Sequence, residues 1–449
     1  MKLFQNIYKT SAALLAIFAL GACQDLLDQE SQIYLENTNP ITNARSAQSA
    51  VIGMYDGLQS DDLYGGSFFI ANELTAGNAE AGAFQVVWNE LSTGIVPTSN
   101  FHVEDMWPAF YKVVNTANTI IQEVPNLLDL GESDKADILG QAYAIRGMVF
   151  FDLLRQFGEY DLENSIYGIP LPLEPILSPT KLARKTVKQS YDAILEDLGK
   201  AEDLLSYSSK RSIITLGTVE ALLARVYLYR GNYDKAFEYA DKVIGHNDLY
   251  NLLGDYNDIY RQKGNEESIF EIAFSLQDQN YTSVLLLTSP AEVLASPELL
   301  ARFGRTDSRS ALFGEIKGTM RCLKYGSNQD AGDANSIVIR LAEMYTIRAE
   351  AYAHDGDLDA AIDDLNILRA RAGANLLIKD AFNSKDKVMD AILKEKQLEF
   401  AFENGNYWFD LGRMGKLTEI RGLPEFRRIY PVPNRELLAD NLLVQNPKY

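Results

Sequence analysis

Three carboxylates near the C-terminal end of the chain have a spacing that suits acid–base chemistry. Glu395, Glu399 and Glu403 are four residues apart, so on a helix they share one face at single-turn intervals. Glycoside hydrolysis uses two carboxyl groups about 5 to 10 Å apart on either side of the scissile bond. Three like charges at this spacing, however, need cations more than they need a substrate. We therefore favour a solvated or ion-paired helix face, and a glycoside hydrolase is the alternative.

Histidine and cysteine are too sparse for the other common catalytic and metal sites. The chain has three histidines, His102, His246 and His354, and none is at ligand spacing to another. Its two cysteines are Cys23 and Cys322. A zinc site or a Cys–His nucleophile pair is therefore not expected. We predict no catalytic residue, no metal site and no cofactor.

Aromatic residues beside amides and carboxylates are the best candidates for binding a neutral ligand. The C–H face of a sugar ring is apolar and stacks on aromatic rings, whereas amide and carboxylate groups bind its hydroxyls. Trp88 has Asn89 and Glu90 beside it and fits this description best. A simple packing role in a loop is the competing interpretation for each candidate. The predicted ligand-binding residues are Trp88, Tyr64, Asn78 and Tyr325.

The composition describes a globular, acidic protein. With 449 residues and 47% hydrophobic content, the chain can bury a large core. Its formal net charge is −20, and no cluster of Lys and Arg stands out, so nucleic acid is not an expected partner.

The N-terminus has the pattern of a bacterial lipoprotein signal. Lys2 and Lys9 precede an apolar run over residues 12–20, which is too short to span a bilayer but suits a signal peptide. Leu20-Gly21-Ala22-Cys23 follows and resembles a lipobox. We predict that residues 1–22 are removed and that Cys23 is acylated, which anchors the chain in a membrane.

Helical periodicity dominates the rest, so we predict a mainly α fold with little β structure. Two stretches lack this periodicity and are rich in glycine and aromatic residues, and we predict that they are loop-rich insertions over 61–100 and 249–335, with one strand at 268–274. Trp107 lies on an apolar helical stripe and is predicted to be a core residue. The predicted helices are 43–58, 103–128, 142–157, 186–205 and 384–403.

Two helical hairpins form the centre of this arrangement. In residues 221–244, Gly231 follows a helix rich in Ala and Leu, and Asn232 is a natural cap for the next helix. Gly356 and Asp357 repeat the spacing in residues 340–371. Both hairpins resemble tetratricopeptide (TPR) units, which form partner-binding scaffolds more often than active sites.

Taken in order, these segments resemble the SusD/RagB outer-membrane lipoproteins of Bacteroidota-type bacteria, over nearly the whole chain. Each segment alone is weak evidence for the family, but the order of the segments along the chain is specific to it. The chain is read as a single SusD-like domain over residues 23–449. The segments that carry the resemblance are the lipobox at Cys23, Arg146 to Gly158 with Gly168-Ile169-Pro170-Leu171, 191–198, 267–270, the two hairpins, 395–413, Tyr430-Pro431-Val432-Pro433 and 445–449.

The resemblance implies a surface-exposed, lipid-anchored outer-membrane protein that binds a nutrient without catalysis. It implies that a SusC-like TonB-dependent barrel receives this nutrient, that the TPR face packs against the barrel, and that the irregular regions form the ligand site. An oligosaccharide is the main expectation, and a peptide ligand is the alternative within the family. A TPR-type assembly lipoprotein without a small ligand is a third interpretation.

The chain also departs from the family pattern at its C-terminal end. Asn406 and Tyr407 stand where an Arg is usual, Lys448 replaces a glycine, and Ala439-Asp440 replaces an Asn-Pro pair. These positions concern packing of the last segment. The second insertion is short for the family, which bears on the size of the ligand pocket.

Overall fold

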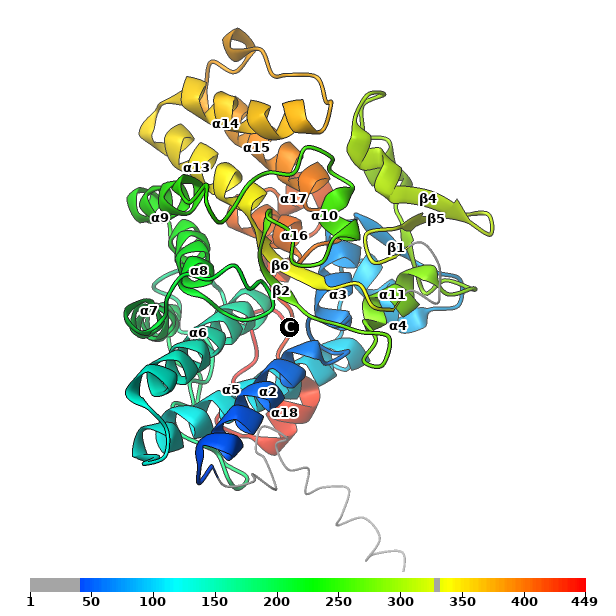
Figure 1. The fold of residues 1–449 in the computed structure, drawn as a ribbon. Coiled ribbons are helices and arrows are strands. Elements are labelled where there is room, and N and C mark those ends of the chain that lie inside the picture. The colour runs from blue at the N-terminus through cyan, green and yellow to red at the C-terminus, as the bar shows by residue number, and fades with distance from the viewer. Residues whose placement is uncertain (1–40, 327–331) are drawn as a thin grey trace, which may run out of the picture.

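The computed structural model describes residues 41–326 and 332–449, which form a helical scaffold with a smaller mixed region on one side (Figure 1). The first half of the scaffold is built from α2 (Ala44–Gln59), α5 (Phe101–Glu123), α6 (Glu132–Phe157) and α7 (Val187–Leu204). Within it, α5 packs against α2 and α6, and α6 packs against α7. Arg146 on α6 joins Asp197 on α7 through two hydrogen bonds of 2.7 Å. Trp107 is buried, as predicted.

Helices α8 (Leu216–Tyr229) and α9 (Tyr233–Gly245) form the first predicted hairpin. Gly231 has a φ of 76°, which a residue with a side chain adopts only at a cost. Its N–H donates to the carbonyl of Leu228 at 3.0 Å. The Asn232 side chain then accepts from the Lys235 N–H at 3.1 Å and caps α9. The glycine and the cap therefore have the roles that their spacing indicates.

The second hairpin, α13 (Leu341–Asp355) and α14 (Leu358–Arg371), repeats this geometry. Gly356 has a φ of 95°, and the Asp357 side chain accepts from the Ala360 N–H at 3.0 Å. Helix α13 packs against both α9 and α14, so the two hairpins stack although the insertion separates them along the chain (Figure 1). Helix α15 (Lys385–Glu399) continues the stack. The predicted mainly α, TPR-like fold is thus confirmed.

Strands in the described residues occur only as antiparallel pairs. β2 (Ser268–Ile272) pairs with β6 (Ser336–Arg340), β4 (Phe313–Ile316) pairs with β5 (Thr319–Cys322), and β1 (Ala79–Ala81) pairs with β3 (Val293–Ala295). The last pair joins the two insertions, which are therefore one structural region.

Two expectations about local structure were wrong. The stretch 61–100 contains α3 (Ser67–Ala76) and α4 (Val86–Ser92), and is therefore less loop-rich than predicted. Every residue of α3 is buried, so the helix has no polar face, and its sequence shows no amphipathic stripe. Helix α15 ends at Glu399, so Glu403 lies in the turn beyond it, where Phe402 has a φ of 62°.

None of the helices that the structure describes has the length and apolar character of a membrane span. Short elements complete the fold. The remaining elements are η1 (Val124–Asn126), α10 (Asp258–Arg261), α11 (Tyr281–Leu287), α12 (Pro297–Leu300), η2 (Ser308–Leu312), η3 (Lys379–Ala381), α16 (Asn406–Arg413), α17 (Leu417–Arg421), η4 (Glu425–Arg428) and α18 (Asn434–Ala439).

Candidate functional site

The three carboxylates that suggested acid–base chemistry are buried in a network of cations. Arg309 donates from Nη1 to Glu395 Oε1 at 2.6 Å and to Glu399 Oε2 at 3.0 Å. Arg340 donates to Glu399 Oε1 at 2.7 Å and, from Nε, to Glu403 Oε2 at 2.8 Å. The three carboxylate residues are at most 2% exposed. The series is therefore an ion-paired core and not a solvated face.

Further cations complete this network. Lys324 donates to Glu403 at 2.6 Å, and Arg371 bonds Glu399. Burial alone would raise the pKa of Glu399, but the guanidinium groups of Arg371, Arg340 and Arg309 outweigh it and lower the pKa below its usual range. Arg340 and Lys324 lower the pKa of Glu403 against burial in the same way. A general acid needs a raised pKa and access to the substrate, so these carboxylates do not form a hydrolase site.

The predicted platform residue Trp88 lies under the surface. Its side chain is 1% exposed, and its ring stacks on that of His102 with centroids 3.5 Å apart and planes 15° apart. Its Nε1 donates to Glu292 Oε2 at 2.9 Å. Neither face of the indole is presented for stacking on a sugar in this conformation.

The other three predicted positions are also buried and hydrogen-bonded. The hydroxyl of Tyr64 donates to Asp152 at 2.5 Å, and that of Tyr325 donates to the Phe402 carbonyl at 2.8 Å. The structure brings Asn78 together with Glu73 and Gln397 in a hydrogen-bonded chain. Asn78 donates to Glu73 Oε2 at 2.8 Å and accepts from Gln397 Nε2 at 2.9 Å. Direct ligand contact by Trp88, Tyr64, Asn78 or Tyr325 stays a prediction.

The same insertion presents an exposed aromatic side chain that the sequence pattern does not single out. Phe84 is 99% exposed and has a φ of 69°, a left-handed conformation that is costly for a bulky residue. The loop is held by the Gly82 N–H, which donates to the Glu292 carbonyl at 2.6 Å. Backbone strain of this kind gathers at functional sites, where surrounding contacts maintain it. The sequence signal that could have indicated Phe84 is an isolated aromatic residue in a short turn after Gly82.

A second exposed ring lies at the start of α5, the helix that carries His102. Phe101 is 59% exposed and begins α5. The preceding residue, Asn100, donates to the Val87 carbonyl at 3.1 Å, which joins the start of α5 to α4. The His102 ring lies between two other rings. Its centroid is 5.6 Å from that of Phe101 on one side, and it stacks on Trp88 on the other. Trp88 thus supports the His102 ring, which in turn contacts Phe101.

Polar groups border these rings. Ser67 Oγ lies 3.3 Å from His102 Nδ1, and burial lowers the pKa of His102 to about 4, so the ring is neutral at pH 7. Half-buried Tyr281 opens α11, and the Thr282 N–H ties that helix to the Gly65 carbonyl at 2.8 Å. Hereafter, the Phe84 surface means Phe84, Phe101, His102 and Tyr281.

Carboxylates lie beside the Phe84 surface. Burial, then the charges of Asp105 and Asp61, raise the pKa of Asp62 to about 6. The Tyr281 hydroxyl interacts electrostatically with Glu292, Asp61 and Asp62. Exposed aromatic rings beside carboxylate and hydroxyl groups are the side-chain types that bind neutral saccharides.

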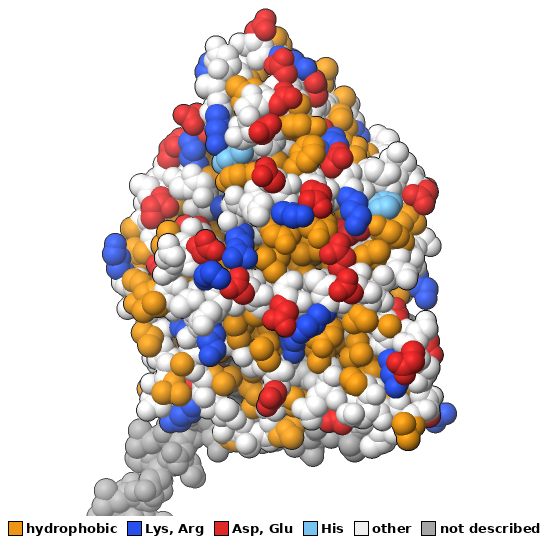
Figure 2. Space-filling model, turned by 90° about the vertical axis from the view of Figure 1, so that its left-hand side faces the viewer, with side chains coloured by type: hydrophobic (Ala, Val, Ile, Leu, Met, Phe, Trp, Pro, Cys, Tyr) orange, Lys and Arg blue, Asp and Glu red, His pale blue; other side chains and the backbone are white. Residues whose placement is uncertain are grey.

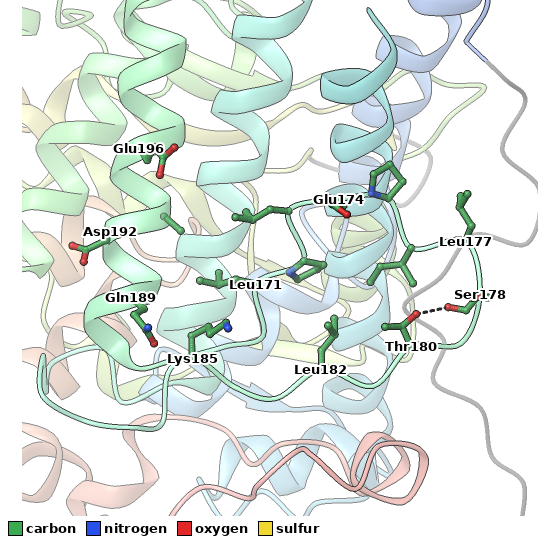
Figure 3. A pocket seen from close by; sticks show the side chains of 15 residues that line it. Leu171, Glu174, Leu177, Ser178, Thr180, Leu182, Lys185, Gln189, Asp192 and Glu196 are labelled. Carbon is green, nitrogen blue, oxygen red and sulfur yellow. Dashed lines mark hydrogen bonds between the residues drawn. The ribbon is translucent and has the colours of Figure 1, made fainter.

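A groove of about 800 Å³ lies elsewhere, between residues 171–182 and α7 (Figure 3). The residues that line it include no aromatic side chain, and its apolar lining is aliphatic. Asp192 and Glu196 are ion-paired to Lys188 and Lys200 at 2.6 and 2.7 Å. This groove lacks a ring on which a sugar could stack, so the Phe84 surface is the better candidate.

Comparisons with known proteins show which family and which solved folds the chain is similar to. A family described as "Starch-binding associating with outer membrane" matches residues 25–228, and the SusD family matches residues 320–426. The SusD-like protein P38 of Formosa agariphila is 25% identical over all of both chains. A SusD superfamily protein of Bacteroides thetaiotaomicron has a TM-score of 0.79 at 23% identity, covering 91% of this chain and 100% of that one. A laminarin-binding SusD-like protein has a TM-score of 0.76 at 23% identity, with the same coverage.

Proposed function

Because the chain belongs to the SusD/RagB family, we propose that it binds a carbohydrate at the cell surface without cleaving it and delivers it to a SusC-like TonB-dependent barrel. The laminarin-binding neighbour supports a saccharide as the ligand class. The observation that carries the proposal is the Phe84 surface, where exposed rings lie beside hydroxyl and carboxylate groups. Aromatic stacking also binds a neutral glycan without a basic patch, which suits an acidic chain.

Absence of catalysis is part of the proposal. The three spaced carboxylates are neutralised by arginines and a lysine, so none is available to protonate a leaving group. We expect the protein to bind an oligosaccharide and return it unchanged. Peptide binding is the alternative within the family, because aromatic rings also accept peptide side chains.

The anchor proposed for the chain is an acylated Cys23. This residue and the signal peptide at 1–22 lie outside the described residues, so the argument rests on the lipobox pattern. Labelled palmitate should enter the wild-type protein and not Cys23→Ala when each is expressed in a lipoprotein-processing host. Equal labelling of both proteins would refute the anchor.

Helices α9 and α13 supply the proposed docking face for the barrel. Figure 2 shows hydrophobic side chains spread across this side of the molecule between charged groups. A cavity of about 390 Å³ between the two helices is lined by Tyr233, Phe237 and Tyr352. Aromatic residues are enriched in protein interfaces. We expect co-purification with a large outer-membrane barrel in mild detergent, and recovery of the lipoprotein alone over several detergents would favour the assembly-lipoprotein interpretation.

Calorimetry with a panel of neutral oligosaccharides and peptides, followed by chromatography of the recovered ligand, tests the proposed activity. Binding of a glucan oligosaccharide that is recovered intact would support carbohydrate binding without hydrolysis. Binding of peptides alone would establish the alternative ligand. Steady release of shortened sugar would overturn the non-catalytic assignment.

A further inference from the structure

A second cavity lies above the buried carboxylate network, apart from the Phe84 surface. It measures about 380 Å³, which is within the range of small-molecule sites. Three segments line it: the turn after α12 with Arg302, α14 with the loop that follows it, and one face of α15. In Figure 1, α14 and α15 stand together at the end of the scaffold. The Phe84 surface uses none of these elements.

The lining of this cavity is basic although the chain is strongly acidic. It contains four cationic side chains, of Arg302, Arg369, Lys387 and Lys394, and one carboxylate, that of Asp307. The whole chain has 42 Lys and Arg residues against 62 Asp and Glu residues. The local balance of charge is therefore the reverse of the global one. An anion is the ligand class that such a lining favours.

Two of the charged groups are already neutralised. Arg309 donates to Asp307 Oδ2 at 2.8 Å, and Arg369 is ion-paired with Glu395. Asp307 therefore does not compensate the cations that face the cavity, and Arg369 adds little net charge to it. The free positive charge must come from the other three residues, which we call the basic triad: Arg302, Lys387 and Lys394.

No member of the basic triad forms an ion pair with another residue in the part of the chain that the structure describes. Lys387 donates to Asn383 Oδ1 at 2.9 Å and to the Ala381 carbonyl at 3.3 Å, both of which are uncharged. All three side chains reach solvent. Lys387 and Lys394 are seven residues apart, which places both on one face of α15. Their charges are thus available to a ligand in the cavity.

The remaining lining suits a ring with hydroxyl groups. Half-buried Phe382 and Leu398 supply an apolar wall. Asn375 lies at the rim, with its side-chain amide free of hydrogen bonds to other described residues. Gln397 lies deeper, and its Nε2 donates to Asn78 Oδ1 at 2.9 Å, which fixes the amide in place. Apolar wall, amides and cations together match a sugar ring that has an acidic substituent.

We propose that this cavity binds the oxyanion of an acidic saccharide, either the carboxylate of a uronic acid or a sulfate ester on a sugar ring. The inference rests on the proposed carbohydrate binding and adds a preference for charged sugars. Lys387 and Lys394 hold the oxyanion, Arg302 approaches it from the opposite wall, and Phe382 lies against the C–H face of the ring. The anion enters from solvent, because the triad lies at the mouth of the cavity.

The test compares matched sugars on the purified full chain by calorimetry at low and at high salt. The probes are a galactose disaccharide, the corresponding digalacturonate and a sulfated galactose disaccharide. The variant is Lys387→Gln/Lys394→Gln, which removes two exposed charges without changing the core. The control is Lys188→Gln/Lys235→Gln, which removes the same charge from α7 and α9, outside the cavity lining. A neutral glucan oligosaccharide is titrated into each sample.

We expect at least one acidic disaccharide to bind about tenfold or more tightly than the neutral one, as charge-assisted hydrogen bonds provide. This preference should fall with added salt and disappear in the Lys387→Gln/Lys394→Gln protein but not in the control. No preference, or a preference that the variant retains, would overturn the inference. Equally tight binding of inorganic sulfate, or tighter binding of a triglutamate peptide, would overturn the saccharide assignment.

Failure of this inference is distinguishable from failure of the proposed function. If the glucan oligosaccharide binds while the acidic sugars show no preference, carbohydrate binding stands and the anionic cavity is refuted. If acidic sugars bind through the two lysines while the glucan does not, the cavity is supported and the Phe84 surface loses its proposed ligand.

Discussion

Arg340 binds Glu399 at two points: Nη1 donates to the carboxylate at 2.7 Å, and Nη2 donates to the backbone carbonyl of the same residue at 2.7 Å. The first bond neutralises a buried charge, and the second closes the end of α15, where carbonyls lack helical partners. Arg340 is the last residue of β6, and Glu399 is the last residue of α15. Their two hydrogen bonds therefore fix the β2–β6 strands to α15.

Removing the Glu399 charge should therefore destabilise the protein strongly. Glu399→Gln leaves Arg309, Arg340 and Arg371 with less countercharge in a buried site, and losing one partner of a buried ion pair costs about 3–5 kcal/mol. Urea denaturation measures this change. The matched control is Glu238→Gln, which breaks an exposed pair with Lys235 and should cost at most about 1 kcal/mol. If both variants lost at most about 1 kcal/mol of unfolding free energy, the buried ion pairs of Glu399 would stabilise the fold no more than an exposed pair does.

The turn between α8 and α9 gives a second prediction. A Cβ at Gly231 would meet no atom within 4 Å, so the cost of Gly231→Val is the left-handed backbone alone, about 1–2 kcal/mol. Gly199→Ala in α7 is the control, because that site is equally open and helical, and it should stabilise slightly. Thermal unfolding of both variants checks the difference. An unchanged melting temperature in Gly231→Val would exclude the left-handed turn.

The hairpins could be predicted because their signals are local. Gly231 and Asn232 are adjacent, and the cap reaches only to Lys235. The spacing of Glu395 and Glu399 likewise predicted their shared face, but not its burial. Their cations come from distant segments, such as Arg309, which lies 86 residues from Glu395. Periodicity identifies a face but not what covers it.

The candidate site shows the same limit more sharply. The sequence neighbours of Trp88 predict a stacking platform, yet His102 and Glu292 cover the ring, and Glu292 is 204 residues away. Phe84 is exposed through a left-handed turn held by Gly82 and the second insertion. A pattern within residues 61–100 does not contain these contacts, so the sequence could single out this stretch but not the exposure of Phe84.

A third prediction concerns Glu73, a buried carboxyl in the chain with Asn78 and Gln397. Burial raises the pKa of Glu73 from 4.5 to about 7, against the hydrogen bonds that it accepts from the Phe402 N–H and Asn78. Since the folded protein holds this proton more tightly than the unfolded chain, the associated stability is present below pH 4.5 and is lost as pH rises through 7. The loss amounts to a few kcal/mol, at about 1.4 kcal/mol per pKa unit.

Unfolding free energies from pH 5 to pH 9 check this point. The wild type should lose stability between about pH 5 and pH 7, with no further loss from this group at higher pH, and Glu73→Gln, which cannot ionise, should show a weaker decline. Glu238→Gln, which removes an exposed carboxylate on α9, is the control and should follow the wild type. Parallel curves for wild type and Glu73→Gln would mean that Glu73 is ionised in the folded state.

The last prediction separates the exposed ring from the ring that supports it. Phe84→Ala should leave the unfolding free energy nearly unchanged, because the side chain is 99% exposed, and relief of the strained backbone is not expected from alanine. Its binding of a neutral oligosaccharide should weaken by roughly 1–3 kcal/mol, the value of a large apolar contact. Trp88→Ala should instead destabilise by about 3–5 kcal/mol, because it empties a packed site between His102 and Glu292. Calorimetry and urea denaturation on the same preparations distinguish the two effects.

A folded Trp88→Ala protein that lost affinity while Phe84→Ala kept it would place the ligand on Trp88 itself, in a conformation that uncovers the indole. Full affinity in both variants would move the neutral-sugar site away from both rings.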